Sequence, residues 1–298
     1  MSESILDFIG ELKEEVLKTE VDVKRAQQIA RLEETMRVYK GEDRLISSFE
    51  IYERIQNSPE EERFETGIKQ FDAVLKGFRK NQVIVLAAPT KSGKTSFCIE
   101  LTIRLEQLNP VWIPFEESAE ELILKFHERG EKPPLFYTPK MMEGNTTEWI
   151  EKRVVEGKVK FGSTIFFIDH LHFIVPFNTD RLDTRIGQVM RDLKSIAKRH
   201  NVIIVLVAHL KKTNMIISPT LEDLRDSSFI AQEADTVIML WRKTMRNGDG
   251  ETVITNNTLI SIQANRKTGS TGNIKMVFKD GRFLEEDWKH TETEHENW

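Results

Sequence analysis

The sequence predicts an α/β fold with a mostly parallel central sheet, preceded by a short helical extension. From residue 63 onward, short apolar runs alternate with stretches of helical periodicity, which is typical of parallel strands joined by helices. Most of these runs show little polar alternation, as expected of strands that are buried on both faces. Residues 1–62 differ from the rest because they are rich in Glu, Lys and Arg.

The extension, residues 1–62, has apolar residues three and four positions apart, a spacing that indicates amphipathic helices. A segment this short buries little core of its own, so we expect its apolar stripes to pack on the main domain or on a neighbouring chain. The run from Asn57 to Glu62, with Ser58 before Pro59, is typical of a boundary. The stripes are Ile5, Leu6, Ile9, Leu12 and Val16, and then Ile29, Leu32 and Met36.

The main domain, residues 63–287, contains seven candidate strands, and a polar tail, 288–298, follows it. The last two strands are separated by Gly269 and Gly272 and are typical of a hairpin at the edge of the sheet. The strands are expected at 83–88, 111–115, 164–169, 202–208, 235–241, 258–264 and 274–278. Helices are expected at 96–108, 119–129 and 229–233.

The composition excludes several classes of protein. Of the 298 residues 39% are hydrophobic, but no apolar run approaches the roughly 20 residues of a membrane span. The N-terminus lacks a signal-peptide pattern, so we expect a cytoplasmic protein that has no membrane partner. The net charge of −5 gives the chain as a whole no attraction for nucleic acid, so a nucleic-acid-binding site must be a local basic patch. The single cysteine, Cys98, excludes an internal disulfide and is expected to be a small buried hydrophobe.

A phosphate-binding loop (P-loop) follows the first strand. Residues Ala88 to Thr95 read Ala-Pro-Thr-Lys-Ser-Gly-Lys-Thr, and a strand, a turn and a helix N-terminus together present N–H groups to phosphate. Gly93 permits the turn, Lys94 is expected to reach the β- and γ-phosphates, and Thr95 is expected to bind Mg²⁺. Ala88 replaces the usual first glycine. An alanine fits at this position if it ends the strand, because its Cβ requires only a negative φ. The residues expected to contact nucleotide are Pro89, Thr90, Lys91, Ser92, Gly93, Lys94, Thr95 and Ser96.

Asp169 and His209 each end a predicted strand. Because the carboxyl ends of parallel strands meet at one edge of a sheet, both side chains are expected near the phosphate loop. Asp169 is expected to hold Mg²⁺ through water beside Thr95. His209 is either a structural histidine or a group that bonds the γ-phosphate and reports hydrolysis to the segment that follows it.

Glu116 and Glu117 follow the predicted strand 111–115. One of them is a candidate for polarising the attacking water, and two acids this close would raise the pKa of one. Alternatively, they begin the predicted helix 119–129 as favourable charges at its N-terminus, or each glutamate has one of these two roles.

Two polar segments at the same edge of the sheet are candidates for binding nucleic-acid phosphates. The first follows His209 and contains Lys211, Lys212 and Arg225; the second is the predicted loop 178–185, which contains Arg181. Exposed lysines and arginines are also common on surfaces that only face solvent.

Residues 64 to about 285 resemble the motor domain of the DnaB and Twinkle class of hexameric replicative helicases, and especially the helicase half of phage primase-helicases. The segment Leu221–Ser227, followed by Ile230–Ile238, resembles the DNA-binding loop and next strand of this class and is the most specific match. The other matching motifs are Thr66–Asp72 with Gly77–Arg79, Ala87–Thr95, Phe115–Ser118, Phe167–Leu171 and Ala208–Lys211.

The resemblance implies a RecA-like ATPase domain that uses ATP and Mg²⁺. Glu117 is the better match to the catalytic glutamate, and the doubled Glu116–Glu117 is also similar to KaiC-type ATPases. The segment 265–272 resembles the one that carries the family's arginine finger, so the resemblance assigns Arg266 to the neighbouring subunit's site. The family's lysine two residues earlier is replaced by Ala264, and the segment is also compatible with a merely charged hairpin turn.

The function implied is that of an ATP-dependent replicative DNA helicase: a ring of six that moves on single-stranded DNA and unwinds forked duplex. Expected partners are DNA, other copies of the chain, and a separate primase or helicase loader. The extension is shorter than the usual DnaB collar domain and would act as a linker helix. The alternatives are a RecA- or KaiC-like ring or filament ATPase that binds DNA or remodels a partner without unwinding, and an assembly in which nucleotide has only a structural role.

Overall fold

The structure is a computed structural model and describes residues 20–38, 40–41, 44–57, 61–130, 132–175, 182–210, 217–224, 227–246 and 252–285. It consists of two compact units, residues 1–60 and residues 61–298. The sequence prediction placed this boundary after residue 62. Among the described residues, no helix combines the length and the apolar character that crossing a membrane requires.

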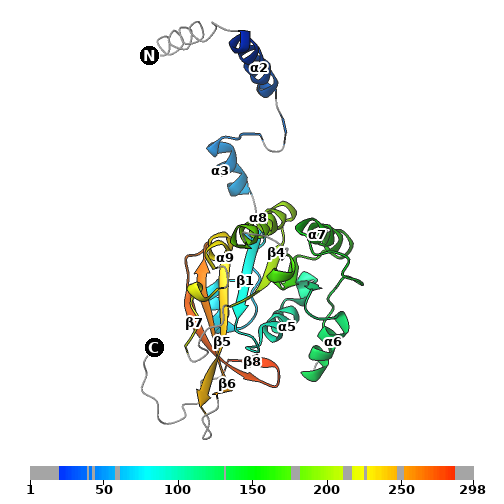
Figure 1. Cartoon of the computed structure of the whole chain (residues 1–298), viewed down its shortest axis with the longest axis vertical. Coiled ribbons are helices and arrows are strands. Elements are labelled where there is room, and N and C mark those ends of the chain that lie inside the picture. The colour runs from blue at the N-terminus through cyan, green and yellow to red at the C-terminus, as the bar shows by residue number, and fades with distance from the viewer. Residues whose placement is uncertain are drawn as a thin grey trace. The chain divides into compact units, whose positions relative to one another are not determined.

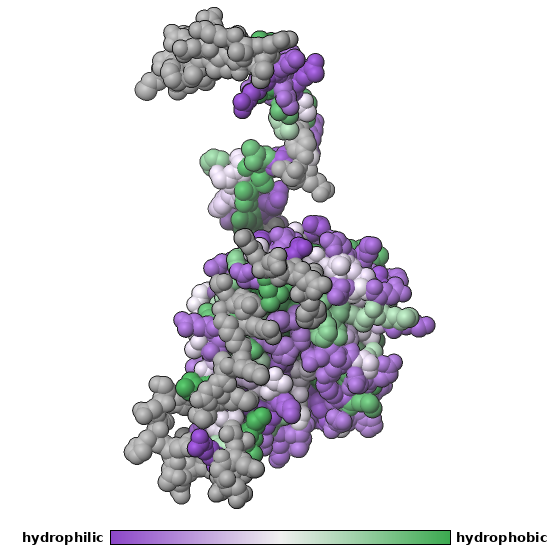
Figure 2. Space-filling view, viewed as in Figure 1, coloured by the Kyte–Doolittle hydropathy of each residue, from purple (hydrophilic) through white to green (hydrophobic). Residues whose placement is uncertain are grey.

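The described part of the first unit contains two helices, α2 (Glu20–Arg37) and α3 (Ser48–Asn57), and no residue of α3 is buried. The α3 helix presents apolar side chains to solvent, some of which are visible in green in Figure 2. The exposed apolar residues of these helices include Ile29, Leu32 and Met36 on α2 and Phe49, Tyr52 and Ile55 on α3. The earlier stripe, 5–16, and the predicted boundary residues 58–60 lie outside the described residues.

The described residues of the second unit form an eight-stranded sheet with the order β2-β3-β4-β1-β5-β6-β7-β8. Helices such as α5 (Lys94–Arg104) and α8 (Leu182–His200) pack around this sheet (Figure 1). The first five strands in the sequence are all parallel, which confirms the prediction of a mostly parallel sheet. All seven residues of β1 are buried, because the strand lies inside the sheet with helices on both faces. These strands are β1 (Gln82–Ala88), β2 (Val111–Pro114), β3 (Ile165–Asp169), β4 (Ile203–His209) and β5 (Thr236–Arg246).

The sheet ends in antiparallel strands: β6 (Thr252–Asn265), β7 (Gly272–Lys279) and β8 (Arg282–Leu284). The hairpin of β6 and β7 was predicted, but its place at the edge was wrong, because β8 forms the edge. Lys279 pairs with Arg282, so only Asp280 and Gly281 connect β7 to β8. Both have positive φ, as the tight turn of a two-residue hairpin requires.

Helices cover both faces of the sheet and enclose two apolar cores. Alternate residues of β1 point to opposite faces: Ile84 and Leu86 enter one core, and Val83 and Val85 enter the other. The first core includes residues of α4 (Lys69–Leu75), α5 (Lys94–Arg104) and α6 (Ala119–Glu128). The second includes residues of α7 (Thr147–Phe161), α8 (Leu182–His200) and α9 (Ser227–Glu233).

Two predicted segments differ from the structure. The predicted helix 96–108 is interrupted after Arg104 and continues as the 3-10 helix η1 (Glu106–Leu108). Residues 182–185 of the predicted loop 178–185 belong to α8, whose apolar stripe faces the second core. Two further 3-10 helices are η2 (Leu171–Phe173) and η3 (Leu221–Asp223).

Candidate nucleotide-binding site

The phosphate loop joins β1 to α5. Gly93 is the N-cap of α5 with φ +94°, and a Cβ added there would lie 3.3 Å from Cζ of Phe283, so both conformation and space favour glycine. Ala88 ends β1 and is not among the residues with positive φ, so it fits without strain as expected. The buried hydroxyl of Ser92 has no hydrogen-bond partner among the described residues. The loop therefore presents an unsatisfied polar group and the N-terminus of a helix to a ligand.

Lys94 begins α5, and its side chain turns back into the loop. Nζ donates to the carbonyl oxygens of Ala88 and Pro89, at 3.2 and 3.4 Å. Burial lowers the pKa of Lys94, whereas Asp169 and Glu116 act in the opposite direction. A mostly buried ammonium group inside a turn of N–H groups is suited to bind a phosphate anion.

Thr95 and Asp169 lie together at the end of β3. The Thr95 hydroxyl donates to Asp169 Oδ2 at 3.3 Å, while the buried Oδ1 has no hydrogen-bond partner among the described residues. Burial, together with the charges of Glu116 and Glu117, raises the pKa of Asp169 to about 6. A hydroxyl and a carboxylate with one unpartnered oxygen are ligands that suit Mg²⁺, so these residues fit that ion.

Glu116 and Glu117 follow β2 and lie beside Asp169, whose carbonyl oxygen accepts a hydrogen bond from Glu116 N at 3.2 Å. Glu116 points toward two histidines: its Oε2 lies 3.7 Å from Nε2 of His170 and 4.0 Å from Nε2 of His209. Glu117 instead forms an ion pair with Lys125 of α6, and its Oε2 is buried without a hydrogen-bond partner among the described residues.

The structure places both glutamates before the first residue of the next helix. Ser118 is the N-cap of α6: its hydroxyl accepts from the Glu121 backbone N–H, and the Glu121 carboxylate accepts from the Ser118 backbone N–H. The carboxylates of this first helical turn are Glu120 and Glu121. Glu116 and Glu117 precede the cap and remain at the edge of the sheet.

His209 ends β4, the strand beside β1, and stands opposite Ala88 in the register. It therefore lies next to the strand end from which the phosphate loop starts. Its ring packs edge-to-face on His170, with 4.1 Å between the centroids, and the ring of His172 lies 6.0 Å from it. The sequence prediction did not single out His170, His172 or Lys125 as site residues. Only the two histidines carried a signal, because they closely follow the strand-ending Asp169.

Arg266 lies far from this group of residues. It follows β6, and its backbone N–H donates to the carbonyl oxygen of Asp235, directly before β5. Because Thr236 pairs with Ile84 near the start of β1, Arg266 is at the amino edge of the parallel strands, opposite the edge that carries the phosphate loop. Its side chain is exposed on a turn, so it does not join its own chain's site.

The candidate nucleic-acid contacts Lys211, Lys212, Arg225 and Arg181 lie outside the described residues. The ends of the first segment are described. Leu210 and Leu224 form an isolated antiparallel bridge, which brings together the base of this segment directly after His209.

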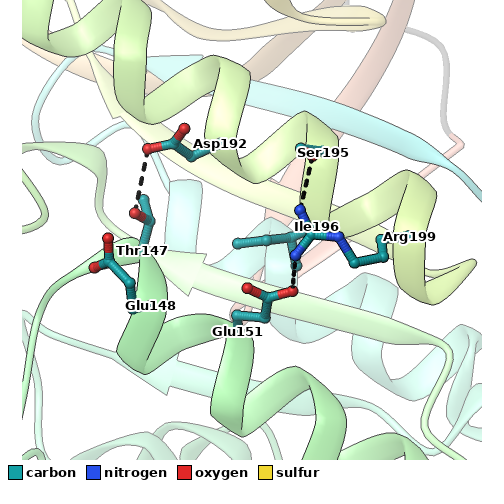
Figure 3. A pocket seen from close by; sticks show the side chains of 7 residues that line it. All are labelled: Thr147, Glu148, Glu151, Asp192, Ser195, Ile196 and Arg199. Atoms are coloured by element: carbon teal, nitrogen blue, oxygen red, sulfur yellow. Dashed lines mark hydrogen bonds and ion pairs between the residues drawn. The ribbon is translucent and has the colours of Figure 1, made fainter. Parts of the chain in front are cut away.

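A pocket between α7 and α8 is separate from the nucleotide site (Figure 3). Arg199 forms an ion pair with Glu151, and Thr147 donates to Asp192 at 3.3 Å. The polar groups of these two helices thus bond one another, as expected of a packed helix pair. The residues that line the pocket are Thr147, Glu148, Glu151, Asp192, Ser195, Ile196 and Arg199.

Comparison with known proteins identifies the family. The family model of the DnaB-like helicase C terminal domain matches residues 64–132 and 140–284, which is more than half of the chain. The chain belongs to this family. The match confirms the DnaB-class resemblance seen in the sequence. Family members use nucleotide, and the loop, the paired glutamates, Asp169 and His209 all fall within the matched ranges.

Curated relatives of this DnaB-like chain are replicative helicases. It is 25% identical over 252 residues to a probable replicative DNA helicase of Trieres chinensis, covering 72% of this chain and 54% of the relative. It is 22% identical over 294 residues to the replicative DNA helicase DnaC of Bacillus subtilis, covering 86% and 63%. The chain thus spans less than two thirds of the length of these relatives.

Solved structures show the same fold. An ATPase domain of known structure matches with a TM-score of 0.65 and 20% identity, covering 79% of this chain and 96% of that one. A DnaB-like replicative helicase, studied for its interactions with primase, matches with a TM-score of 0.67 and 19% identity, covering 95% and 75%. These likenesses confirm the RecA-like α/β domain.

Proposed function

We propose that this chain is an ATP- and Mg²⁺-dependent DNA helicase motor that acts in DNA replication as a ring of six copies. The observation that carries the proposal is the convergence at one sheet edge of a phosphate loop, a candidate Mg²⁺ carboxylate, two glutamates and a histidine, contributed by β1, β2, β3 and β4. The DnaB-like family supplies the activity class. We assign the motor to the cytoplasm, where it would meet its DNA.

The residues divide the chemistry of ATP hydrolysis among themselves. Lys94 and the loop N–H groups would bind the phosphates, and Thr95 and Asp169 would hold Mg²⁺, whose charge would offset that of the phosphates. Glu117 accepts the proton of the attacking water. His209, beside the phosphate loop, forms a hydrogen bond with the γ-phosphate. The segment that directly follows His209 would then change position when this bond is lost on hydrolysis.

The position of Arg266 supports assembly into a ring. An exposed arginine at the edge opposite the phosphate loop can complete the site of a neighbouring copy but not its own, and an arginine finger stabilises charge on the transferring phosphate. Repeating this head-to-tail contact generates a ring when the rotation closes. The positions Lys211, Lys212, Arg225 and Arg181 are proposed to follow the DNA phosphates inside it.

A separate primase or a helicase loader is a further proposed partner. The proposal is supported by the fold likeness to the DnaB-like helicase whose interactions with primase are the subject of that structure.

The test is unwinding of a forked DNA substrate with ATP and Mg²⁺ at low salt. We expect strand displacement by the natural chain, none by Lys94→Ala, and undiminished displacement by Lys160→Ala, which removes an exposed lysine at the end of α7. If the natural chain hydrolyses ATP in response to single-stranded DNA but displaces no strand, it does not unwind DNA by itself; this result points to a translocase, a filament-forming ATPase or a helicase that lacks its loader. ATP binding without any DNA-stimulated hydrolysis would contradict the helicase proposal and these alternatives.

A further inference from the structure

A glutamate and two histidines meet beside the phosphate loop, each from the end of a different strand. Glu116 follows β2, His170 follows β3 and His209 ends β4. We propose that these three residues form a binding site for a transition-metal ion such as Zn²⁺. This site is distinct from the Mg²⁺ position that we assign to Thr95 and Asp169.

The geometry is close to that of a three-ligand metal site. One ligand atom from each of the three residues lies within 4.8 Å of the other two. Glu116 Oε2 is 3.7 Å from His170 Nε2 and 4.0 Å from His209 Nε2. A tetrahedral Zn²⁺ with bonds of about 2.0–2.1 Å places its ligand atoms about 3.3 Å apart. The cluster therefore needs to contract only slightly.

The burial of the three side chains shows which of them would move. The His170 side chain is 10% exposed and is held by its packing, whereas that of Glu116 is 47% exposed and is free to adjust. The edge-to-face packing of His170 and His209 keeps both rings in place beside the carboxylate. Two fixed imidazoles and one adjustable carboxylate leave a fourth position open to water or to a phosphate oxygen.

The chemistry of the ligands favours Zn²⁺ over Mg²⁺. Imidazole nitrogen suits Zn²⁺, Co²⁺ and Ni²⁺, whereas Mg²⁺ prefers oxygen ligands. The surroundings of the cluster carry both signs of charge: Asp169 directly precedes His170, Glu117 directly follows Glu116, and Lys94 interacts electrostatically with Glu116 and His170.

Occupation of this site would inhibit the motor, an expectation that rests on the proposed function. A metal ion on Glu116 and His209 would hold the proposed γ-phosphate sensor and the neighbour of the catalytic glutamate in one arrangement. Zn²⁺ would then lower ATP hydrolysis even when Mg²⁺ is in excess, and a chelator would restore it. Metal binding itself requires no catalytic activity.

The test uses Co²⁺ as a spectroscopic substitute for Zn²⁺ on the full chain without nucleotide. We expect the visible d–d absorption of four-coordinate Co²⁺, and its loss when Zn²⁺ is added. His170→Gln and Glu116→Gln should each weaken Co²⁺ binding by about 100-fold or more, since loss of a ligand costs at least as much as loss of its supporting groups. His127→Gln, which changes an exposed histidine of α6, should leave the spectrum unchanged.

The outcomes separate this inference from the proposed function. A chain that unwinds DNA but shows no four-coordinate Co²⁺ spectrum would overturn the metal site and leave the helicase proposal intact. A chain that binds Co²⁺ through these residues but unwinds no DNA would support the metal site and contradict the helicase proposal. A Co²⁺ spectrum that persists in both ligand variants would also overturn the site. Because Glu116 is half-exposed, Glu116→Gln keeps the test decisive if His170→Gln does not fold.

Discussion

Glu116 and Glu117 are neighbours in the chain, yet their carboxylates face different surroundings. Glu117 is 22% exposed and pairs with Lys125, with one carboxylate oxygen buried and unbonded among the described residues. Glu116 is 47% exposed and faces two histidines. A buried carboxylate oxygen with no protein donor is well placed to accept a proton from water, which favours Glu117 as the base.

Replacing each glutamate by glutamine tests this assignment. Glu117→Gln should lower kcat for ATP hydrolysis by at least about 100-fold, because general-base catalysis is lost, while nucleotide binding is retained. Glu116→Gln should lower it by less than about tenfold. Steady-state hydrolysis and binding of a fluorescent nucleotide measure the two effects. The reverse order of severity would make Glu116 the base.

Part of this site was predictable from single residues. Lys94, Thr95, Asp169 and His209 were found because each stands where a strand ends or a helix begins, and the topology of a parallel sheet brings such positions to one edge. The pairing of Lys125 with Glu117 was not predictable, because it depends on how α6 packs on the sheet. The spacing of residues in the sequence does not give the orientation of α6 on the sheet.

At the scale of elements, a buried ion-pair network joins α5, which follows the phosphate loop, to the end of α6, which follows the paired glutamates. Glu100 of α5 forms ion pairs with Arg129, the C-cap of α6, and with Arg104, at 2.6 Å in the second case. Arg104 also donates to the Thr66 carbonyl oxygen at 3.3 Å. This network fixes the two helices relative to each other and so holds both halves of the site together.

Breaking the network should destabilise the domain. Arg129→Leu leaves Glu100 buried with one partner fewer, which should lower the free energy of unfolding by about 3 kcal/mol. The matching fall in Tm is about 6–12 °C for a domain of this size. In the control Arg191→Leu, an exposed arginine loses a 3.4 Å pair with Glu233, and the cost should be at most about 1 kcal/mol. Equal shifts in the two melting curves would show that the network contributes no more than a surface pair.

The elements themselves were predicted unevenly. The buried strands were predicted because a run such as 83–88 is apolar on both faces. Such a strand fits only in the interior of a sheet that is covered on both sides. The short strand β8 was missed, although Asp280-Gly281 is a typical hairpin turn, because only three residues follow that turn in the strand. The early end of α5 at Arg104 depends on the packing of Leu105 and Leu108 in the first core, which no local pattern reveals.

At the scale of the whole molecule, the phosphate loop and Arg266 occupy opposite edges of one sheet. The contact that would unite them is therefore between different faces of two copies. In the proposed ring, each copy would both supply Arg266 to one neighbour and receive it from the other.

This arrangement predicts that two inactive variants will restore each other. Lys94→Ala lacks a working phosphate loop but keeps Arg266, and Arg266→Ala has the opposite defect. In a random one-to-one mixture, about a quarter of the interfaces combine an intact loop with an intact arginine. We expect each variant alone to be inactive and the mixture to regain ATP hydrolysis in that proportion. A mixture as inactive as its components would show that Arg266 does not act between copies.

The Phe283 ring lies over Gly93, so a segment near the end of the domain packs beside a loop near its beginning. Phe283 belongs to the last strand, and its ring also packs against Phe97 of α5, with 5.3 Å between the centroids. During synthesis, the phosphate loop emerges from the ribosome long before the strand that supports it. A nascent chain therefore lacks Phe283 beside its phosphate loop until translation has passed β8, and we expect nucleotide binding to reach full strength only after that point.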